Sequence, residues 1–523
     1  MYSNKRNINI LTALLPLHGV KNIVVCPGSR NAPLAHNLEQ HPEIKCFPVT
    51  DERSAAFNAL GMMLDTPSHP AAVCVTSGSA LLNLSPAVAE AYYRHLPLII
   101  ISADRPAARI DQNDGQTIRQ PGALANITAM TVDLPEDDDE YISRLVNIAL
   151  VEAKRKMQPV HINVRLSEPL FDFRVTNLPS MNDSKLVHIT QTTDLEACRM
   201  MARRIEEAER PMLVTGCTRE MPVGLIERLR SFLAVAAEPL ATGGKAVNID
   251  RTVDMTSQKP DLVIYTGGSL VSKKLRLWLT DSEAHMIQIS EYGEICDTFS
   301  HLETVVEADP VTALGNISDY LSEKKDYAEE WNRHSAEARK ELYAATPKYS
   351  EELAVRMLEN IIGKRKNVAV HYANSSSVRL GCRYADHYIY VNRGVNGIDG
   401  SGSTAAGHSM VTDKTVYYVT GDLSFFYDQN MLWNAGLGGN LRIMLLNNGG
   451  GEIFSRLPGL KKTPEHGRDI WASHNTSAEG ICADNHVEYI RADNETQLLH
   501  GLRQLTREEA ARPVLMEIIF KNK

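Results

Sequence analysis

The chain has 523 residues, of which 43% are hydrophobic and 23% are charged, with a formal net charge of −9. This balance is typical of globular α/β proteins and excludes a disordered chain or a coiled coil. The acidic net charge argues against a general nucleic-acid binder, which would carry extended basic patches. At about 150 residues per domain, the length predicts about three domains.

No apolar stretch approaches the ~20 residues that a membrane-spanning helix requires. The N-terminal segment carries no cleavage-site pattern, so we expect no signal peptide. The eight cysteines are scattered without a CxxC pair. They are typical of small buried side chains in a reducing compartment, and we expect a cytoplasmic protein without disulfides.

The first third of the chain alternates short β-branched runs with amphipathic stretches, a pattern typical of parallel sheets with crossover helices. The predicted strands are Asn22–Cys26, Cys46–Val49, Ala72–Thr76, Leu98–Ser102 and His161–Val164. The predicted helices are Asn31–Glu39, Glu52–Leu64 and Ser79–Tyr93. Asn, Pro, Ser and Asp collect between Phe171 and Leu186, which predicts a linker.

Two further α/β sets follow the linker. The predicted strands are Met212–Thr215, Leu262–Thr266 and Met286–Ile289, then Asn367–His371, Tyr388–Asn392, Val416–Thr420, Leu441–Asn447 and Val514–Ile519. A polar helix at Glu329–Ala345 joins the two sets. We therefore predict three doubly wound parallel-sheet α/β domains, at residues 1–175, 187–345 and 350–523.

The third set contains a candidate metal and phosphate site. Asp422 and Asn448 each follow a predicted strand, and twenty-six positions separate them. Two consecutive parallel strands would bring them together at the carboxyl edge of the sheet, where open α/β sheets bind ligands. Carboxylate, amide and carbonyl oxygens suit Mg²⁺. Gly421 would let the backbone approach closely, and a helix opening at Ser424 would direct free N–H groups at a diphosphate. Each half alone is more typical of an ordinary turn, but both halves at this separation, each after a strand, favour the metal and phosphate site.

The Gly-Asp and Asn-Asn halves resemble the thiamine-diphosphate and metal motif of thiamine enzymes, with Leu423 where that motif has a third-position Gly. The resemblance implies a carboxyl group that hydrogen-bonds the aminopyrimidine ring and promotes loss of the thiazolium C2 proton. Glu52 is the candidate, since TDERSAAFNALG places it at the start of an apolar helix after a strand. By itself, Glu52 is also typical of an acidic residue in the first turn of a helix.

Several motifs together narrow the resemblance. CPGSRNAPL, TDERSAAFNALG, TSGSALLNLSPAVAEA, ISADRP with GQTIRQPG, NRGVNGIDGSGSTAAG, GDLSFFYDQN and NNGGGEIFSRLP occur in this order. They closely resemble the family of 2-succinyl-5-enolpyruvyl-6-hydroxy-3-cyclohexene-1-carboxylate synthases. These thiamine enzymes of menaquinone biosynthesis join 2-oxoglutarate to isochorismate with loss of CO₂, a transferase activity. The middle of the chain matches mainly at SLVSKKLRLWL.

The resemblance implies a pyrimidine-binding domain, a central domain and a diphosphate-binding domain, in chain order. It implies thiamine diphosphate and Mg²⁺, or Mn²⁺, as cofactors. The metal ligands would be Asp422, Asn448 and Gly450, and the cofactor-binding residues would also include Glu52, Gly421, Leu423 and Ser424. Ile398, Ile453, Phe454 and Leu457 would form an apolar wall around the thiazolium, although each is also compatible with core packing.

The anionic substrates account for cations within apolar or glycine-rich motifs, because Arg is a planar fork for carboxylates. By resemblance, Ser375, Arg379 and Arg393 would hold the carboxylates derived from 2-oxoglutarate. Ser29, Arg30, Arg105, Gln116 and one or both of Lys273 and Lys274 would face isochorismate. Any single cation could instead form a surface ion pair.

The resemblance also implies a homodimer or a dimer of dimers, in which Glu52 reaches the cofactor of a neighbouring chain. Two other functions remain open from the sequence. One is another thiamine-dependent 2-oxoacid decarboxylase or an acetolactate-type ligase, which would act on pyruvate alone. The other is a non-catalytic binding protein on the same fold, although it would have no reason to retain Glu52, Asp422 and Asn448 together.

Overall fold

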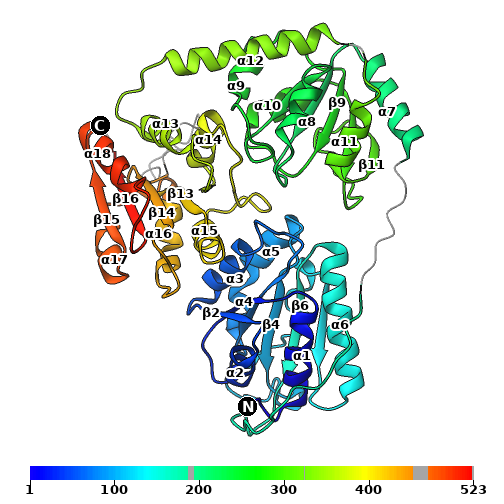
Figure 1. Ribbon diagram of the computed structural model, residues 1–523, viewed down its shortest axis with the longest axis vertical. Helices are drawn as coiled ribbons and strands as arrows, with labels where there is room; N and C mark the ends of the chain where they lie inside the picture. Colours follow the sequence, from blue (N-terminus) through cyan, green and yellow to red (C-terminus); the bar gives the residue numbers. More distant parts are fainter. Residues whose placement is uncertain (186–193, 323, 452–468, 521–523) are drawn as a thin grey trace. The chain divides into compact units, whose positions relative to one another are not determined.

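The computed structural model describes residues 1–185, 194–322, 324–451 and 469–520. The chain forms two compact units. The first contains residues 1–188, 394–492 and 503–523, and the second contains residues 189–393 and 493–502. The strands form three parallel sheets that alternate with helices along the chain (Figure 1). The predicted α/β class with three parallel sheets is confirmed.

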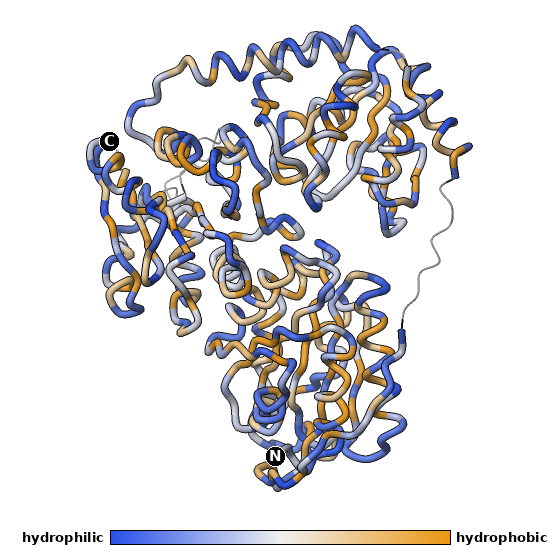
Figure 2. Tube along the Cα trace, in the orientation of Figure 1, coloured by the Kyte–Doolittle hydropathy of each residue, from blue (hydrophilic) through white to orange (hydrophobic). Residues whose placement is uncertain are grey.

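The first sheet lies in the first unit and has the strand order β2-β1-β3-β4-β6-β5, with every neighbouring pair parallel. Its strands are β1 (Asn22–Val25), β2 (Lys45–Pro48), β3 (Ala71–Val75), β4 (Ile99–Asp104), β5 (Met130–Leu134) and β6 (Val160–Arg165). Its helices are α1 (Arg6–Leu17), α2 (Ala32–Gln40), α3 (Glu52–Gly61), α4 (Ser79–Asn83), α5 (Ser85–Tyr93) and α6 (Asp139–Lys156). Every residue of the central strands β3 and β4 is buried, as a parallel sheet covered on both faces requires, and most of these residues are hydrophobic (Figure 2).

The predicted helix Ser79–Tyr93 is wrong in one respect, because the structure divides it at Leu84. Pro86 has no N–H to donate to the carbonyl of Leu82. The hydroxyl of Ser85 donates to that carbonyl instead, at 2.6 Å. Residues 171–185 contain no helix or strand, as the linker prediction requires.

The second sheet lies in the second unit, in the order β11-β10-β9-β7-β8. Its strands are β7 (Pro211–Thr215), β8 (Ala234–Ala237), β9 (Leu262–Thr266), β10 (His285–Ser290) and β11 (Leu302–Glu307). Its helices are α7 (Leu195–Glu207), α8 (Val223–Leu229), α9 (Ile249–Met255), α10 (Lys273–Thr280), α11 (Pro310–Ser318) and α12 (Asp326–Ala344). Two hydrophobic clusters cover the two faces, and the fully buried Trp331 anchors the long polar helix α12 to one of them.

The second unit continues through α13 (Glu351–Ile362), β12 (Val368–Tyr372) and α14 (Ser376–Tyr384). The strand predicted at Tyr388–Asn392 is wrong, because this segment forms only a single bridge, between Tyr390 and His371. The flanking Ile389 N–H donates to the carbonyl of Pro239, outside the sheet.

Four strands of the third sheet lie in the first unit, in the order β13-β14-β16-β15. They are β13 (Thr415–Gly421), β14 (Leu441–Asn447), β15 (Glu488–Ala492) and β16 (Val514–Ile519). The helices in this part of the chain are α15 (Ser401–Ser409), α16 (Asp422–Tyr427), α17 (Glu479–Asp484) and α18 (Glu495–Leu505). Helix α15 packs closely on α3, since a Cβ at Gly407 would lie 2.1 Å from the Asn58 carbonyl oxygen. Only glycine permits this approach.

Candidate functional site

The carboxyl ends of β13 and β14 bring Asp422 and Asn448 together, as predicted. Gly421 pairs with Leu446 in the parallel register, so β13 and β14 end at the same level of the sheet. The Asp422 Oδ2 atom accepts hydrogen bonds from the N–H groups of Asn448 at 3.1 Å, Gly449 at 2.7 Å and Gly450 at 3.0 Å. The turn after β14 therefore wraps around one carboxylate oxygen.

Glycine is required in this turn. Gly449 and Gly450 have φ angles of +82° and +154°. A Cβ at Gly450 would also lie 2.7 Å from the Trp471 Nε1 atom. The side-chain oxygens of Asn447 and Asn448 accept the N–H groups two residues onward, at 3.1 and 3.2 Å. Such Asx turns stabilise the conformation locally, which is why the Asn-Asn-Gly-Gly sequence forms it.

Asp422 is 3% exposed, and this burial raises its pKa. The N–H groups of Leu423, Gly449 and Gly450 and the nearby His474 ring oppose the shift, because they favour the carboxylate. The His474 Nε2 atom lies 3.4 Å from Oδ2. Sequence reasoning missed His474, and no motif around it would have identified it.

These residues fit a divalent cation with a diphosphate. The Asp422 carboxylate, the Asn448 amide and the Gly450 carbonyl supply hard oxygen donors, and Mg²⁺ takes its remaining ligands from water and phosphate. A Cβ built at Gly421 would meet no atom of the described residues within 4 Å, so these residues leave space beside the strand end. In the described parts of the chain, no cluster of three His, Cys, Asp or Glu side chains offers an alternative metal site.

The predicted helix start at Ser424 is wrong by two residues, because α16 begins at Asp422. The Leu423 N–H donates to Asp422 Oδ1 at 2.7 Å, so the first turn is closed by its own carboxylate. The Ser424 hydroxyl donates to the Ile398 carbonyl oxygen at 2.6 Å. This bond places the half-exposed Ile398 beside the motif. The other predicted wall residues, Ile453, Phe454 and Leu457, lie outside the described residues.

Glu52 is the first residue of α3, and the residues on either side of it form hydrogen bonds with other parts of the first unit. Asp51 caps the helix by accepting the Ser54 N–H, and it also accepts the Asn430 side chain at 2.6 Å. The Arg53 guanidinium donates to the Tyr427 carbonyl oxygen at 2.6 Å. No hydrogen bond or ion pair to Glu52 is found within the described ranges. Its side chain lines a hollow of about 410 Å³, together with Asp51, Arg53, Asn83 and Trp433.

The second unit joins Arg379 and Arg393 through one short segment between β9 and α10. The Arg393 Nη2 atom donates to the Leu270 carbonyl oxygen at 2.7 Å, and Nη1 donates to Asn374 Oδ1 at 3.2 Å. The Arg379 Nη1 atom donates to the Val271 carbonyl oxygen at 3.1 Å. The buried Arg393 Nε–H has no acceptor among the described residues. Two guanidinium groups are thus held by consecutive carbonyls, an arrangement suited to binding an anion.

Ser375 is the residue directly before α14 and has φ +75°; it follows Asn374, which bonds Arg393.

Helix α10 carries the two candidate lysines at its start. Lys274 is exposed and pairs with Asp254 at 2.7 Å. Lys273 is also exposed, and no partner is found for it in the part of the chain that the structure describes.

The remaining candidates follow β1 and β4. Ser29 is exposed, whereas Arg30 is buried and bonds the Leu166 carbonyl oxygen at 3.1 Å and Glu168 at 2.9 Å. Arg105 donates to the Gly115 carbonyl oxygen at 2.9 Å and so closes its own loop. Gln116 is exposed on this loop with φ +54°. No described contact joins the Arg30 and Arg105 groups to each other.

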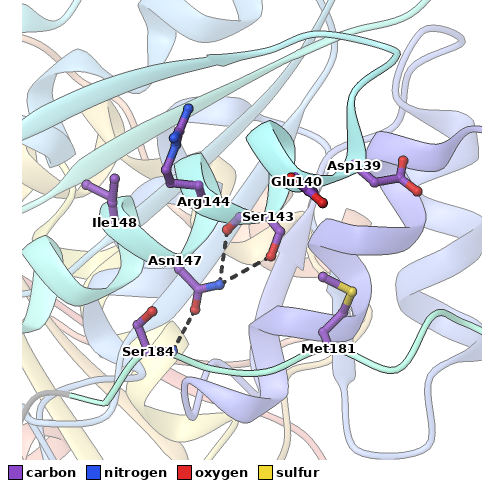
Figure 3. Close-up of a pocket in the computed structure, with 8 residues that line it drawn as sticks. All are labelled: Asp139, Glu140, Ser143, Arg144, Asn147, Ile148, Met181 and Ser184. Atoms are coloured by element: carbon purple, nitrogen blue, oxygen red, sulfur yellow. Dashed lines mark hydrogen bonds between the residues drawn. The ribbon is translucent and has the colours of Figure 1, made fainter.

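A second hollow, of about 450 Å³, lies beside α6 and contains none of the predicted residues. Figure 3 shows that the Asn147 side chain bonds Ser143 and Ser184 there. Its NH₂ group donates to the Ser143 carbonyl oxygen at 3.0 Å, and its oxygen accepts the Ser184 N–H at 2.8 Å. Its polar groups thus tie the linker to the helix.

Among the described helices, none is both long and apolar enough to cross a lipid bilayer.

Residues 8–123 match the family model described as "Thiamine pyrophosphate enzyme, N-terminal TPP binding domain". A protein of Bacteroides thetaiotaomicron is 40% identical, over 100% of this chain and 97% of its own length. A protein of Bacteroides fragilis is 41% identical over 100% and 97%, and one of Porphyromonas gingivalis is 34% identical over 88% and 85%. Each is named 2-succinyl-5-enolpyruvyl-6-hydroxy-3-cyclohexene-1-carboxylate synthase.

Proposed function

Because the chain belongs to the family of 2-succinyl-5-enolpyruvyl-6-hydroxy-3-cyclohexene-1-carboxylate synthases, we propose that it decarboxylates 2-oxoglutarate and adds the succinyl unit to isochorismate. The reaction depends on thiamine diphosphate and belongs to menaquinone biosynthesis. The observation that carries this proposal is the turn after β14, whose three N–H groups enclose the Asp422 carboxylate beside Asn448.

In this proposal, Asp422, Asn448 and the Gly450 carbonyl hold Mg²⁺ or Mn²⁺, and Gly421, Leu423 and Ser424 adjoin the diphosphate. Thiamine diphosphate, when bound, supplies the group that accepts the electron pair as CO₂ leaves. The Glu52 carboxyl group would hydrogen-bond a nitrogen of the aminopyrimidine ring. The absence of a bonding partner for Glu52 among the described residues supports this role. Ile398 contributes to the apolar surroundings, which disfavour the charged ground state.

The substrate roles follow from charge. Arg379 and Arg393, with Ser375, hold the carboxylates of 2-oxoglutarate, and the anchoring of both guanidinium groups on consecutive carbonyls supports this assignment. Isochorismate is held by residues from three segments: Ser29, Arg30, Arg105, Gln116 and Lys273. Lys274 is the weaker candidate, because its ammonium already pairs with Asp254.

We also propose that the enzyme is cytoplasmic and acts as a homodimer or a dimer of dimers. In such an assembly, Glu52 of one chain would serve the cofactor held by Asp422 of its neighbour. The exposed Tyr427 and Trp433 side chains near the Glu52 hollow support an interface there, because large exposed apolar side chains favour association.

The test is CO₂ release by the purified protein with thiamine diphosphate and Mg²⁺. It compares 2-oxoglutarate with pyruvate, each with and without isochorismate. We expect release from 2-oxoglutarate, with formation of the adduct only when isochorismate is present. Release from pyruvate alone would instead indicate a decarboxylase or an acetolactate-type ligase. No release from either acid, despite measurable cofactor binding, would indicate a binding protein.

A further inference from the structure

A buried carboxylate lies behind the two arginines of the second unit. Glu238 follows β8 directly and is 1% exposed. Its Oε1 atom accepts the N–H groups of Val271 at 3.0 Å and Ser272 at 2.8 Å, and Oε2 accepts that of Val271 at 2.9 Å. Glu238 therefore bonds the segment between β9 and α10 through its backbone donors.

The same segment presents its carbonyls to the arginines. Leu270 accepts Arg393 and Val271 accepts Arg379. The Ser269 hydroxyl also donates to the Arg393 carbonyl oxygen at 2.9 Å. Residues 269–272 thus form one bridge, with Glu238 on its donor side and both guanidinium groups on its acceptor side.

Burying a carboxylate is costly unless hydrogen bonds and opposite charge compensate. Burial raises the pKa of Glu238 to about 7, while the N–H groups of Val271 and Ser272 and the charge of Arg393 act against this rise. An apolar side chain after β8 would avoid the cost but would leave two backbone N–H groups without acceptors. The buried Glu238 carboxylate is therefore explained by the Val271 and Ser272 N–H groups whose hydrogen bonds it accepts.

We propose that Glu238 is a positioning residue for the substrate. By fixing residues 269–272, it sets the separation of the Arg379 and Arg393 guanidinium groups and thereby selects a 2-oxo acid that carries a second carboxylate. This inference rests on the proposed function, in which the two arginines bind 2-oxoglutarate.

The test variant is Glu238→Gln, which keeps one accepting oxygen and replaces the other with an NH₂ group facing the Val271 N–H. We expect KM for 2-oxoglutarate to rise about tenfold, with kcat changed less than about threefold, because ground-state positioning is lost. Thiamine diphosphate affinity, measured by calorimetry, should stay unchanged. The preference for 2-oxoglutarate over pyruvate should fall by a similar factor.

The matched control is Glu359→Gln. Glu359 is another buried carboxylate of the second unit, but it bonds Tyr372 at 2.5 Å and His387 at 2.8 Å rather than residues 269–272. This variant should lose thermal stability without a change in KM. An equal rise in KM in both variants would overturn the proposal, because it would reflect general destabilisation. An unchanged KM in folded Glu238→Gln would overturn it as well.

A double-mutant cycle with Arg393→Ala tests whether Glu238 acts through that arginine. The effects on KM should be strongly non-additive, and full additivity would contradict the proposal. If Glu238→Gln does not fold, Ser269→Ala removes only the hydroxyl that bonds the Arg393 carbonyl. The KM of Ser269→Ala for 2-oxoglutarate should rise about threefold, and an unchanged KM would contradict the proposal.

Hydrogen exchange provides a readout that needs no activity. The Val271 and Ser272 amides should exchange about tenfold faster in Glu238→Gln than in the parent, whereas the amides of β9 should not change. A parent enzyme inactive on 2-oxoglutarate would refute the proposed function rather than the bridge. Unchanged exchange at Val271 and Ser272 would refute the bridge itself.

Discussion

Replacing Arg393 tests the substrate assignment most directly. Its guanidinium is fixed by Nη2 on the Leu270 carbonyl and by Nη1 on the Asn374 side chain, which holds its charge in one place. Losing one hydrogen bond to a charged group costs ~1.5–3 kcal/mol. Since ~1.4 kcal/mol corresponds to a factor of ten, Arg393→Ala should lower kcat/KM for 2-oxoglutarate by roughly ten- to a hundredfold.

Arg393→Lys should recover less than about tenfold of this loss. One ammonium cannot bond the Leu270 carbonyl, the Asn374 amide oxygen and a substrate carboxylate in the geometry of a planar fork. The assay is steady-state CO₂ release with saturating thiamine diphosphate and Mg²⁺. Calorimetry measures cofactor affinity in parallel.

Arg383→Ala is the matched control, because Arg383 lies on α14 with Arg379 but pairs with Glu352 at 2.7 Å. Its kcat/KM should stay within about twofold of the parent value, as expected for a partly exposed ion pair. The reasoning would be refuted if Arg393→Ala lost thiamine diphosphate affinity while keeping its KM for 2-oxoglutarate. Arg393 would then belong to the cofactor site.

Three further predictions concern the first unit. Asp422→Ala should abolish Mg²⁺-dependent thiamine diphosphate binding in calorimetry with an unchanged circular dichroism spectrum, and unchanged affinity would remove the metal site. Mixing inactive Glu52→Gln and Asp422→Ala chains should restore some activity, because a mixed dimer contains one intact site; no recovery despite demonstrated subunit exchange would place each site within one chain. The His408 ring and the Lys414 ammonium hold the pKa of Asp65 well below its usual 3.8, so the contacts stabilise the fold at neutral pH and weaken as pH falls below that value. Asp65→Asn should therefore cost about 1 kcal/mol in urea unfolding at pH 7 and less at pH 3, whereas an equal cost at both would contradict the assignment.

The sequence by itself determined the α/β class and the meeting of Asp422 with Asn448. Both follow from local patterns, since β13 and β14 are consecutive, mostly hydrophobic and joined by one crossover. Parallel pairing then leaves their carboxyl ends at one edge whatever the rest of the chain does. The need for glycine in the Asn447–Gly450 turn is local too, because it depends on φ angles and Asx bonds.

Only the tertiary structure decided which side chains surround these motifs. His474 approaches Asp422 from a segment without any signature, and Glu238 reaches residues more than thirty positions away along the chain. The distinction between Lys273 and Lys274 likewise depends on Asp254 of another helix. Such contacts join residues whose spacing carries no periodic signal, so they are fixed by packing between elements rather than by any local preference of the chain.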